Sequence, residues 1–405
     1  MTENTLITYD QALTILRQYK GVFSSVSKPL EACTGAYLAE DLFADRAFPP
    51  FDRVTMDGIA IAFNTFENGK RVFLVEDIAP AGMAQKTLKD TQNCIEVMTG
   101  AIMPNGVDTV IRYEDIEIEN GWATIHLDTL NFKQNVHFKG IDIAKDARIV
   151  QKGKQLSSAE INIAAAIGKD TLKVVQFPKA VIISTGDELV PVSETPELHQ
   201  IRRSNIYGIK NTLQEWGMVS DLEHLPDDKA QMLKIIGRLL ENYELLIFTG
   251  GVSKGKFDYL PDVLEELNVK KHFHKIQQRP GKPFWFGTTD AGNKIFALPG
   301  NPVSSFVCVY LYLQYWLKQS MGLEMEMLTV KLGTNITFNP DLIYFLEAKL
   351  ESQKDGSLMA MPELGNGSGD FANLVKTDGF LILPQNKSQF FANEVYPFVP
   401  YRRKW

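Results

Sequence analysis

The stretch from Lys179 to Met321 alternates short apolar runs with segments of helical spacing, and this alternation limits the fold more than any other feature of the chain. The expected strands are Ala180–Ser184, Met218–Glu223, Leu245–Thr249, Lys271–Ile276, Pro283–Gly287 and Lys294–Leu298. The expected helices are Asn205–Trp216, Asp227–Tyr243 with Asp227 as its cap, Leu260–Leu267 and Val303–Met321. Such alternation is typical of a mostly parallel α/β sheet with helices on both faces.

The segments on either side of this stretch have other patterns. Helical spacing predicts one helix over Thr8–Lys20, and a second that begins with the capping box of Ser157 and Glu160 and ends at Gly168. Short β-rich runs separated by turn residues occupy two regions: Arg71–Glu76, Cys94–Met98, Thr109–Ile118 and Ala123–Leu127 in the first, and the chain from Glu324 to Trp405 in the second. We therefore expect a β-rich unit before the α/β stretch and a compact β unit after it.

The composition is that of a globular protein with several domains. The chain has 405 residues, which suggests two to four domains at roughly 100–200 residues each. Apolar residues make up 44% and charged residues 22%, so sizeable cores can form. The formal net charge of -7 argues against a general nucleic-acid coat, which needs a basic surface. No apolar run reaches the roughly 18 residues of a membrane-spanning helix.

The cysteines and the first residues favour a cytoplasmic location. Cys33, Cys94 and Cys308 lie far apart and form no CxxC pair, so we expect neither a disulfide framework nor a zinc cluster. Charged residues interrupt the first twenty positions, so we expect no secretory leader.

Three of the expected strands end in small, glycine-rich turns. These turns are Thr185-Gly186-Asp187-Glu188, Thr249-Gly250-Gly251-Val252-Ser253 and Pro299-Gly300-Asn301-Pro302-Val303-Ser304. Ligands of open α/β sheets bind beyond the carboxyl ends of the strands. Glycines let backbone N–H groups approach an anion, and Pro302 suits the first position of a helix whose free N–H groups attract anions. One such turn is usually structural, but three at one sheet edge predict a phosphate or oxyanion site.

Charged residues follow these turns. Lys275, Arg279 and Lys282 fall in one short stretch, where Arg279 can form two hydrogen bonds to an oxyanion, although a solvated loop explains the pattern equally well. Magnesium favours one or two carboxylates plus substrate phosphates. Asp187, Glu188 and Asp258 can supply such carboxylates, although acidic residues after strands are often only helix caps.

The β-rich unit contains three further segments of interest. The run from Phe48 to Gly58 is too rich in proline for a regular element, and its Asp57-Gly58 pair is either a simple turn or a fixed loop that presents a carboxylate. Thr99-Gly100 opens a similar tight turn, and Asp142 brings a further acid.

Other sequence features exclude several kinds of site. His272 and His274 lie on one face of an expected strand without a third ligand nearby, so we expect surface residues rather than a metal site. The chain has neither a GxSxG nor a GxxxxGK[ST] motif, which argues against a serine hydrolase and a P-loop ATPase.

Together these motifs resemble the MoeA family, the molybdopterin molybdenumtransferases of molybdenum-cofactor synthesis, which are related to the E domain of gephyrin. The resemblance covers nearly the whole chain. It rests on Pro50–Gly58, Thr99–Ala101, Gly140–Ile143, Ser184–Leu189, Thr249–Ser253, Pro280–Pro283, Leu298–Ser304 and Gly365–Ser368. Each segment is short, but their order and number are specific.

The resemblance implies a multidomain protein of the α/β plus β class. An elongated segment would comprise residues 1–42 and 143–176, with an inserted β-rich domain at 43–142. A MogA/MoaB-like molybdopterin-binding α/β domain at 177–324 and a C-terminal β-barrel at 325–405 would follow. Family members are homodimers whose site lies between the α/β domain of one subunit and the β-rich domain of the other.

The resemblance also implies a reaction and a set of roles. Molybdate is joined to adenylylated molybdopterin with Mg²⁺, and AMP is released. By position, the metal ligands would be Asp57, Glu188 and Asp258, with catalytic roles for these three and for Asp142, Lys275 and Arg279. The substrate-binding residues would be Thr99, Thr185, Gly186, Asp187, Thr249, Gly250, Gly251, Ser253, Lys282, Pro299, Gly300, Asn301, Pro302, Ser304 and Ser368.

Several positions depart from the family pattern. Arg203 stands where an aspartate is usual, and Lys254 and Lys256 replace a small apolar and often an acidic residue. His137 stands where an arginine-rich run is usual. These changes move positive charge toward the α/β domain.

Two alternatives to the transferase therefore stay open at this point. The first is a molybdopterin-binding scaffold that has lost catalysis, because the lysines alter the charge of the site. The second is a nucleotide-cleaving enzyme on the same α/β unit, as in CinA-like relatives, although the resemblance at both ends of the chain argues against it.

Overall fold

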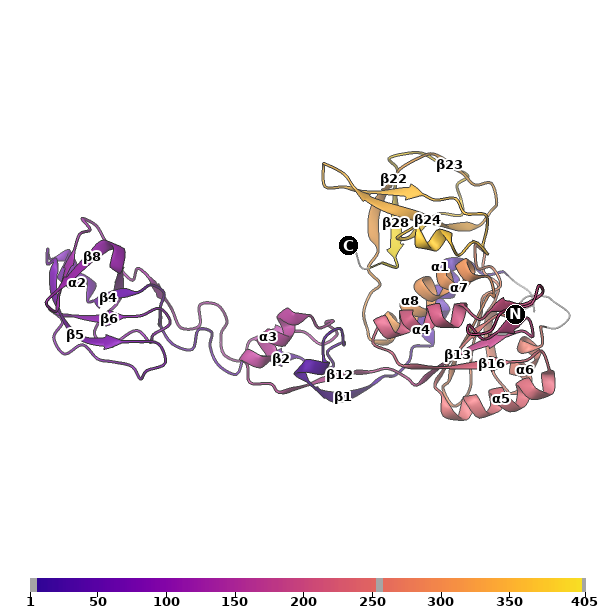
Figure 1. Cartoon of the computed structure of the whole chain (residues 1–405), viewed down its shortest axis with the longest axis horizontal. Helices are drawn as coiled ribbons and strands as arrows, with labels where there is room; N and C mark the ends of the chain where they lie inside the picture. The colour runs from indigo at the N-terminus through magenta and orange to yellow at the C-terminus, as the bar shows by residue number, and fades with distance from the viewer. Residues whose placement is uncertain (1–5, 253–257, 403–405) are drawn as a thin grey trace. The chain divides into compact units, whose positions relative to one another are not determined.

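The computed structural model describes residues 6–252 and 258–402 of the chain. The chain divides into two compact units, which are identified in Figure 1 by residue colour. Unit 1 comprises Met1–Val26 and Val174–Trp405, and unit 2 comprises Ser27–Lys173. The chain passes from one unit to the other through β1 (Ser24–Pro29) and β12 (Thr171–Gln176), which pair with one another. The four-part division expected from the sequence is finer than these two units, and its boundaries stay predictions.

The main sheet of unit 1 has six strands in the order β16-β13-β17-β21-β20-β18. Their bounds are β13 (Ala180–Thr185), β16 (Ser220–Leu225), β17 (Leu245–Thr249), β18 (Lys270–His274), β20 (Trp285–Thr288) and β21 (Lys294–Leu298). The first four strands in this order are parallel, and β20 and β18 are antiparallel. The mostly parallel sheet predicted from the alternation is confirmed.

Helices cover both faces of this sheet (Figure 1). One face carries α4 (Asn205–Glu215), α7 (Pro302–Cys308) and α8 (Gln314–Ser320), and the other carries α5 (Lys229–Asn242) and α6 (Leu260–Glu266). Successive strand residues point to opposite faces. On β13, Ile182 accordingly belongs to the core that contains α4, whereas Val181 and Ile183 belong to the core that contains α5. A strand buried on both faces must be apolar throughout, which explains its continuous apolar run.

The N-terminal helix α1 (Tyr9–Gln18) also packs in unit 1. Thr8 and Gln11 form its capping box, as the expected cap at Thr8 requires. Leu16 is fully buried in the core that contains α4. Arg17 donates from Nε to Gln319 Oε1 of α8 at 3.1 Å, so α1 belongs to the α/β part of the structure.

Two details of the helices differ from the sequence expectations. The cap of α5 is Asp228 and not Asp227, because Asp228 has the extended backbone of a cap residue and its carboxylate accepts from the Gln231 N–H at 2.8 Å. The long helix expected over Val303–Met321 contains a π-helical turn, η3 (Val309–Leu313), between α7 and α8.

The C-terminal part of unit 1 is a closed β-barrel. Its strands follow the order β24-β25-β22-β28-β26, and β26 pairs back onto β24. Their bounds are β22 (Leu328–Leu332), β24 (Ile343–Ser352), β25 (Leu358–Pro362), β26 (Gly379–Leu383) and β28 (Val395–Pro400). Closure removes the free strand edges that an open sheet would expose. A further strand, β19 (Gln278–Arg279), pairs in parallel with β24 and thus connects the barrel to the α/β part.

Unit 2 is built around a second six-stranded sheet, in the order β7-β4-β6-β5-β9-β8. Its strands are β4 (Gly58–Ile61), β5 (Val72–Ala79), β6 (Cys94–Val97), β7 (Thr109–Arg112), β8 (Ile116–Glu119) and β9 (Trp122–Ile125). The β-rich run expected over Thr109–Ile118 contains β7 and the start of β8, which the 3₁₀ turn η2 (Tyr113–Asp115) separates. Arg112 donates to Asp115 across this turn at 2.8 Å.

The remaining elements are short. Unit 2 also contains η1 (Leu30–Ala32), β2 (Leu42–Phe43), β3 (Arg53–Val54), α2 (Phe63–Glu67), β10 (Val136–His137), β11 (Arg148–Val150) and α3 (Ser158–Ala166). The capping box that Ser157 and Glu160 form at α3 is the one expected from the sequence. Unit 1 also contains β14 (Leu189–Val190), β15 (Ile201–Arg202), β23 (Ile336–Thr337), η4 (Asn373–Val375) and β27 (Gln389–Phe390). In the described part of the chain, no helix has the length and hydrophobicity that a membrane span requires.

Candidate functional site

A cavity of about 520 Å³ lies in unit 1 at the carboxyl ends of β13, β17 and β21. We call it the strand-end cavity. All three glycine-rich turns singled out in the sequence contribute to its wall. Of the expected site residues it is lined by Thr185, Gly186, Glu188, Thr249, Gly250, Gly251, Asp258, Pro299, Gly300, Asn301 and Pro302. The structure thus brings together segments that lie more than a hundred residues apart.

The close approach of the turns requires glycine at their tips. Gly250 and Gly251 have φ angles of +98° and +71°, which side chains with a Cβ rarely adopt. A Cβ on Gly250 would lie 2.9 Å from Thr185 Oγ1, and one on Gly251 would lie 3.0 Å from the same atom. The Gly250 N–H donates to the Leu298 carbonyl at 3.0 Å, so the second turn is fixed between the first and the third.

Acidic residues gather on one side of the cavity. Glu188, Asp227 and Asp258 line it, and Asp187 contacts Asp227 through a reciprocal pair of bonds. The Asp227 N–H donates to Asp187 Oδ1 at 3.1 Å, and the Asp187 N–H donates to Asp227 Oδ2 at 3.4 Å. Burial raises the pKa of Asp227, and the charges of Asp187 and Asp258 raise it further. Carboxylates held this close favour a nearby cation.

These acids do not form a complete metal site by themselves. Among the described residues, no three His, Cys, Asp or Glu side chains converge as metal ligands. The donor set nevertheless suits Mg²⁺, which takes one or two carboxylates and completes its shell with water and substrate phosphate oxygens. Glu188 and Asp258 both line the cavity and can serve in this way.

The third turn is held by the C-terminal barrel. The Asn301 side-chain amide donates to Ser368 Oγ at 2.7 Å, and the Val303 N–H donates to the Ser368 carbonyl at 3.1 Å. Pro302 has no N–H, so the N–H of Val303 is the first backbone donor of α7. Ser368 accepts from this donor, which was expected from the sequence to face an anion. Ser304 is buried in α7 and does not line the cavity.

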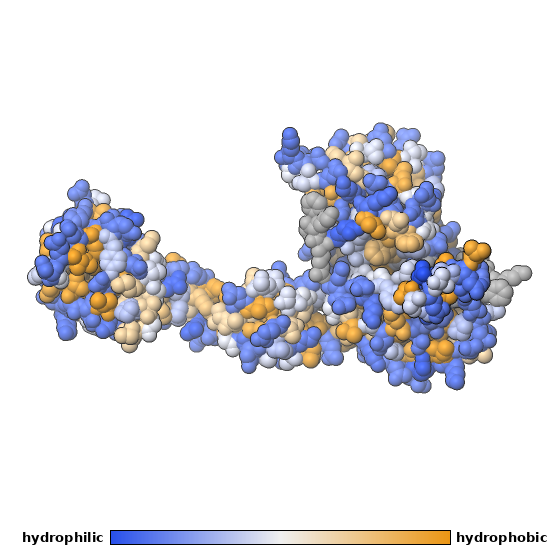
Figure 2. Space-filling model, in the orientation of Figure 1, coloured by the Kyte–Doolittle hydropathy of each residue, from blue (hydrophilic) through white to orange (hydrophobic). Residues whose placement is uncertain are grey.

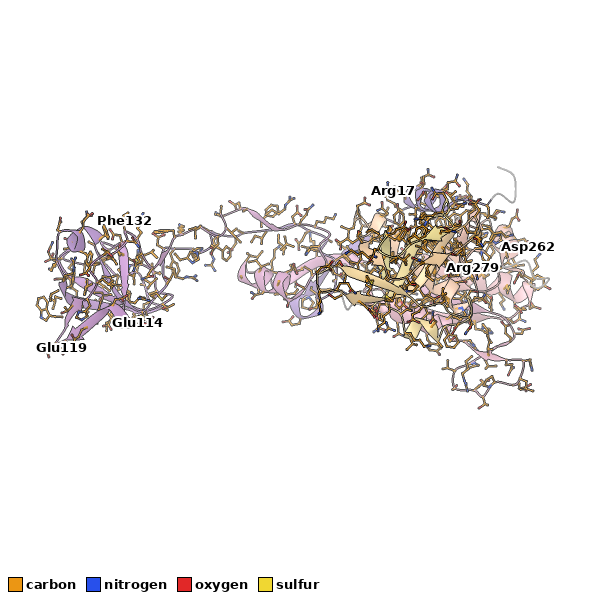
Figure 3. The ribbon with its side chains drawn as sticks, turned by 90° about the horizontal axis from the view of Figure 1, so that it is seen from above. Arg17, Glu114, Glu119, Phe132, Asp262 and Arg279 are labelled. Atoms are coloured by element: carbon orange, nitrogen blue, oxygen red, sulfur yellow. The ribbon has the colours of Figure 1, made fainter. Side chains whose placement is uncertain are left out.

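The basic residues expected next to the turns lie elsewhere. Arg279 is exposed on β19, beside the barrel strand β24, with its guanidinium 5.9 Å from the centroid of the Phe338 ring (Figure 3). Lys275 and the exposed Lys282 do not line the cavity. The arginines that do line it are Arg202 and Arg203.

In unit 2, Asp57 is presented by a fixed loop. Its Oδ1 accepts from the Thr99 N–H at 2.6 Å, and this bond lowers the pKa of the Asp57 carboxyl. The following Gly58 lies so close to β7 that a Cβ there would be 1.9 Å from the Ile111 carbonyl oxygen. The side chain of Asp57 is exposed. The sequence hypothesis of a loop that presents a carboxylate agrees with this geometry.

Asp142 belongs to a short chain of polar contacts in unit 2. Its Oδ1 lies 2.9 Å from His137 Nε2, and His137 Nδ1 lies 3.3 Å from Arg53 Nη2. Because a guanidinium can only donate, Nδ1 is the acceptor and Nε2 carries the proton that is donated to Asp142. His137 therefore positions the Asp142 carboxylate.

The remaining expectations concern residues that follow β17 in the sequence and two histidines of β18. Ser253, Lys254 and Lys256 lie outside the described residues. The expectation that His272 and His274 are surface residues is wrong, since both are half-buried. His272 stacks on Tyr19 with 3.6 Å between ring centroids and bonds to Thr288 Oγ1, and His274 bonds to the Val252 carbonyl.

Sequence reasoning missed several cavity residues. Four residues line the cavity although they were not among the predicted site residues: Ser184, Arg202, Ser204 and Asp227. The sequence predicts Asp227 as a helix cap. Its position just after β16, the neighbour of β13, could instead have indicated a place at the carboxyl ends of the strands. Arg202 ends β15 and Ser204 lies on the connection from β15 to α4, whose path the sequence does not predict.

Comparison with known proteins gives matches along almost the whole chain. Residues 7–168 match the MoeA N-terminal region (domain I and II), residues 181–319 a probable molybdopterin binding domain, and residues 329–401 the MoeA C-terminal region (domain IV). The chain is 38% identical to a molybdopterin molybdenumtransferase of Synechocystis sp., over 97% of this chain and 99% of that protein. It is 27% identical to one of Staphylococcus aureus, over 97% and 95%.

A solved structure matches as extensively. The crystal structure of a molybdopterin biosynthesis MoeA protein from Pyrococcus horikoshii is 27% identical and superposes with a TM-score of 0.84. The match covers 99% of this chain and 100% of the other.

Proposed function

Since the chain belongs to the MoeA family and is a molybdopterin molybdenumtransferase of molybdenum-cofactor biosynthesis, we propose that it joins molybdate to adenylylated molybdopterin in the strand-end cavity and releases AMP. The observation that carries this proposal is the cavity itself. Its volume of about 520 Å³ lies within the roughly 300–1,000 Å³ of small-molecule sites. It combines close backbone turns and arginines, which suit an anionic substrate, with carboxylates, which suit a metal ion.

The three turns would hold the substrate phosphate. These turns would approach it with the hydroxyls of Thr185 and Thr249 and with backbone N–H groups such as that of Gly251, because glycine leaves room for close contact. Ser368 would act indirectly by fixing Asn301. Binding two anions next to each other removes most of the entropy cost of their encounter, which is the main contribution open to a protein whose substrates already carry the reactive groups.

The carboxylates would serve the metal and the cleavage of the phosphoanhydride. Glu188 and Asp258, with Asp227 beside them, would hold Mg²⁺ through one or two oxygens. The ion would supply positive charge at the phosphoanhydride where AMP leaves. Lys275, Arg279 and Lys282 are proposed for the approach of molybdate from the side of the barrel.

The proposal includes a homodimer, in which the β-rich domain of one subunit completes the cavity of the other with Asp57, Thr99 and Asp142. Both carboxylates are exposed, and each has an exposed large apolar neighbour, Met56 at 43% and Ile141 at 62%. Larger exposed apolar patches rimmed by polar residues mark interaction surfaces, and Met56 and Ile141 are proposed to belong to such a surface. Figure 2 shows apolar residues on the visible face of unit 2.

AMP release tests the reaction. Purified protein is given adenylylated molybdopterin and Mg²⁺, with and without molybdate, and AMP is measured. We expect molybdate-dependent release that falls at least about a hundredfold in Asp258→Asn, since removing one charge-stabilising group costs about this much. Glu265→Gln, on the same side of unit 1 in α6, is the matched control with wild-type rate. Tight pterin binding without release would instead establish the scaffold alternative.

Mixing two inactive variants tests the shared site. In a heterodimer of Asp57→Asn and Glu188→Gln, one cavity carries both changes and the other carries neither. Half of the randomly formed dimers are heterodimers with one intact site of two, so about a quarter of the wild-type rate should return. Activity that stays at the level of the separate variants would contradict the shared site.

The cytoplasm is the proposed compartment. The three cysteines are buried and unpaired in the described structure, which suits reducing conditions. Fractionation of the source cells with an antibody to the chain would test this.

A further inference from the structure

Arg203 carries the clearest unexplained feature of the strand-end cavity. Its Nε is buried, and among the described residues it has no hydrogen-bond partner. Almost all buried polar groups in proteins are hydrogen-bonded, so an orphaned donor needs a specific reason. The cost is greater for a charged group, because its desolvation is not offset by a bond.

The backbone around Arg203 is fixed, so the side chain does not lie in the cavity by chance. The Arg203 N–H donates to the Val190 carbonyl at 3.1 Å, which continues the pairing of β14 and β15. Two residues later, the Asn205 side chain donates to the Gly300 carbonyl at 2.7 Å. The connection from β15 to α4 is therefore tied to the third glycine-rich turn, and Arg203 lines the cavity from this fixed position.

The charge of Arg203 acts at the end of β13. It lowers the pKa of His224, after the larger effect of burial. His224 Nδ1 lies 3.0 Å from the hydroxyl of Ser184, which lines the cavity immediately before Thr185. Arg203 and Ser184 thus line the same cavity, which the hydroxyl and glycine of the first turn also line.

The neighbouring Arg202 has a bonded Nε, in contrast to Arg203. It also lines the cavity, but its Nε donates to the Glu194 carbonyl at 3.0 Å. The Nε of Arg202 thus holds the loop, whereas the Nε of Arg203 remains available for something that enters the cavity.

From these observations we infer that Arg203 binds a tetrahedral oxyanion of the substrates in the strand-end cavity, with Nε and a terminal amino group as the two donors. The planar guanidinium matches two oxygens of a phosphoryl group or of molybdate. This inference rests on the proposed function, which supplies both anions. Without Arg203, a metal ion alone would supply the positive charge at this anion. In this chain, Arg203 supplies part of that charge.

The test is equilibrium binding of two probes, AMP and molybdate, measured by isothermal titration calorimetry on the full chain. The variants are Arg203→Gln and Arg203→Lys. We expect Arg203→Gln to weaken one probe by about ten- to hundredfold, which is the effect of losing a charge-assisted bond. Loss for AMP identifies the phosphoryl group as the ligand, and loss for molybdate identifies the metal oxyanion. Arg203→Lys should recover only part of the affinity, because it keeps the charge without the two-pronged geometry.

Two readouts separate this role from a structural one. Since Nε has no partner in the part of the chain that the structure describes, Arg203→Gln should keep the wild-type melting temperature, whereas a structural arginine would lower it. Arg238→Gln removes the same charge from the surface of α5, where Arg238 pairs with Glu223 at 2.8 Å, and should leave both affinities unchanged.

The inference is overturned if Arg203→Gln binds both probes within twofold of wild type, or if the wild-type chain binds neither probe. The AMP-release assay on the wild-type chain tests the proposed function separately from this inference. A chain that releases no AMP but loses probe affinity in Arg203→Gln would keep the inference and reject the reaction.

Discussion

Replacing Glu347 by glutamine should remove a pH dependence from the C-terminal barrel. Glu347 is half-buried on β24, and its Oε1 accepts from the Asn373 side chain at 3.2 Å. Burial raises the pKa of this carboxyl to about 7, the Asn373 bond lowers it in part, and the charge of Asp370 raises it further. Asn373 and Asp370 belong to the loop that also carries Ser368, the contact of the third turn of the site.

Proton linkage gives both the sign and the size of the expected change in stability with pH. A carboxyl whose pKa is raised from 4.5 to about 7 on folding favours the folded state below pH 4.5, and this contribution is lost as the pH rises through about 7. The full interval corresponds to about 3 kcal/mol at about 1.4 kcal/mol per pH unit. Because Glu347 is only half-buried, solvent screening reduces the expected effect to about 1–2 kcal/mol. Glu347→Gln removes the ionisation and keeps the size of the side chain.

Hydrogen exchange measures this effect locally, which avoids the assumption that two units unfold in one step. Opening free energies of β24 and β26 are measured at pH 5, 6, 7 and 8. The wild-type values should fall by about 1–2 kcal/mol relative to those of Glu347→Gln as the pH rises. Glu351→Gln, exposed on the same strand and 3.7 Å from Lys349, is the control and should behave as wild type. Parallel pH profiles for wild type and Glu347→Gln would refute the reasoning.

Two further predictions concern unit 2 and the α/β part. Gly58→Ala places a Cβ 1.9 Å from the Ile111 carbonyl, so it should separate β4 from β7 and destabilise unit 2 by more than about 3 kcal/mol, measured by exchange in both strands; wild-type protection there would contradict the packing. Asp228→Ala should lower the stability of α5 by about 1 kcal/mol, because the Gln231 N–H loses its acceptor. Asp227→Ala should not affect this cap. Thermal melts of the two variants test which of the two aspartates caps α5.

The buried strands were the most predictable part of the fold. The predicted Leu245–Thr249 and Lys294–Leu298 match β17 and β21 residue for residue. A central strand covered on both faces must be apolar throughout, so its run of side chains is bounded sharply by polar or turn residues. The three turns after such strands could be predicted to meet, because parallel strands end at one edge.

Other features depend on contacts that no local pattern specifies. Asp227 and Asp228 are adjacent and chemically identical, and only the backbone of the finished turn decides which one caps α5 and which one faces Asp187. The bond between Asn301 and Ser368 joins positions 67 residues apart in the chain. The alternation after Glu324 predicted a compact β unit, and the family resemblance supplied the barrel, but the pairing of β26 with β24 that closes it is a tertiary result.

The most direct test of the account is hydrogen exchange of the wild-type chain with and without adenylylated molybdopterin, in the absence of molybdate so that the substrate is not consumed. The account predicts protection of the turns at Thr185–Leu189, Thr249–Val252 and Leu298–Pro302, together with the start of α4. Protection of these segments would locate the substrate in the strand-end cavity. A substrate that binds tightly while all three turns exchange at their free rates would contradict the central claim.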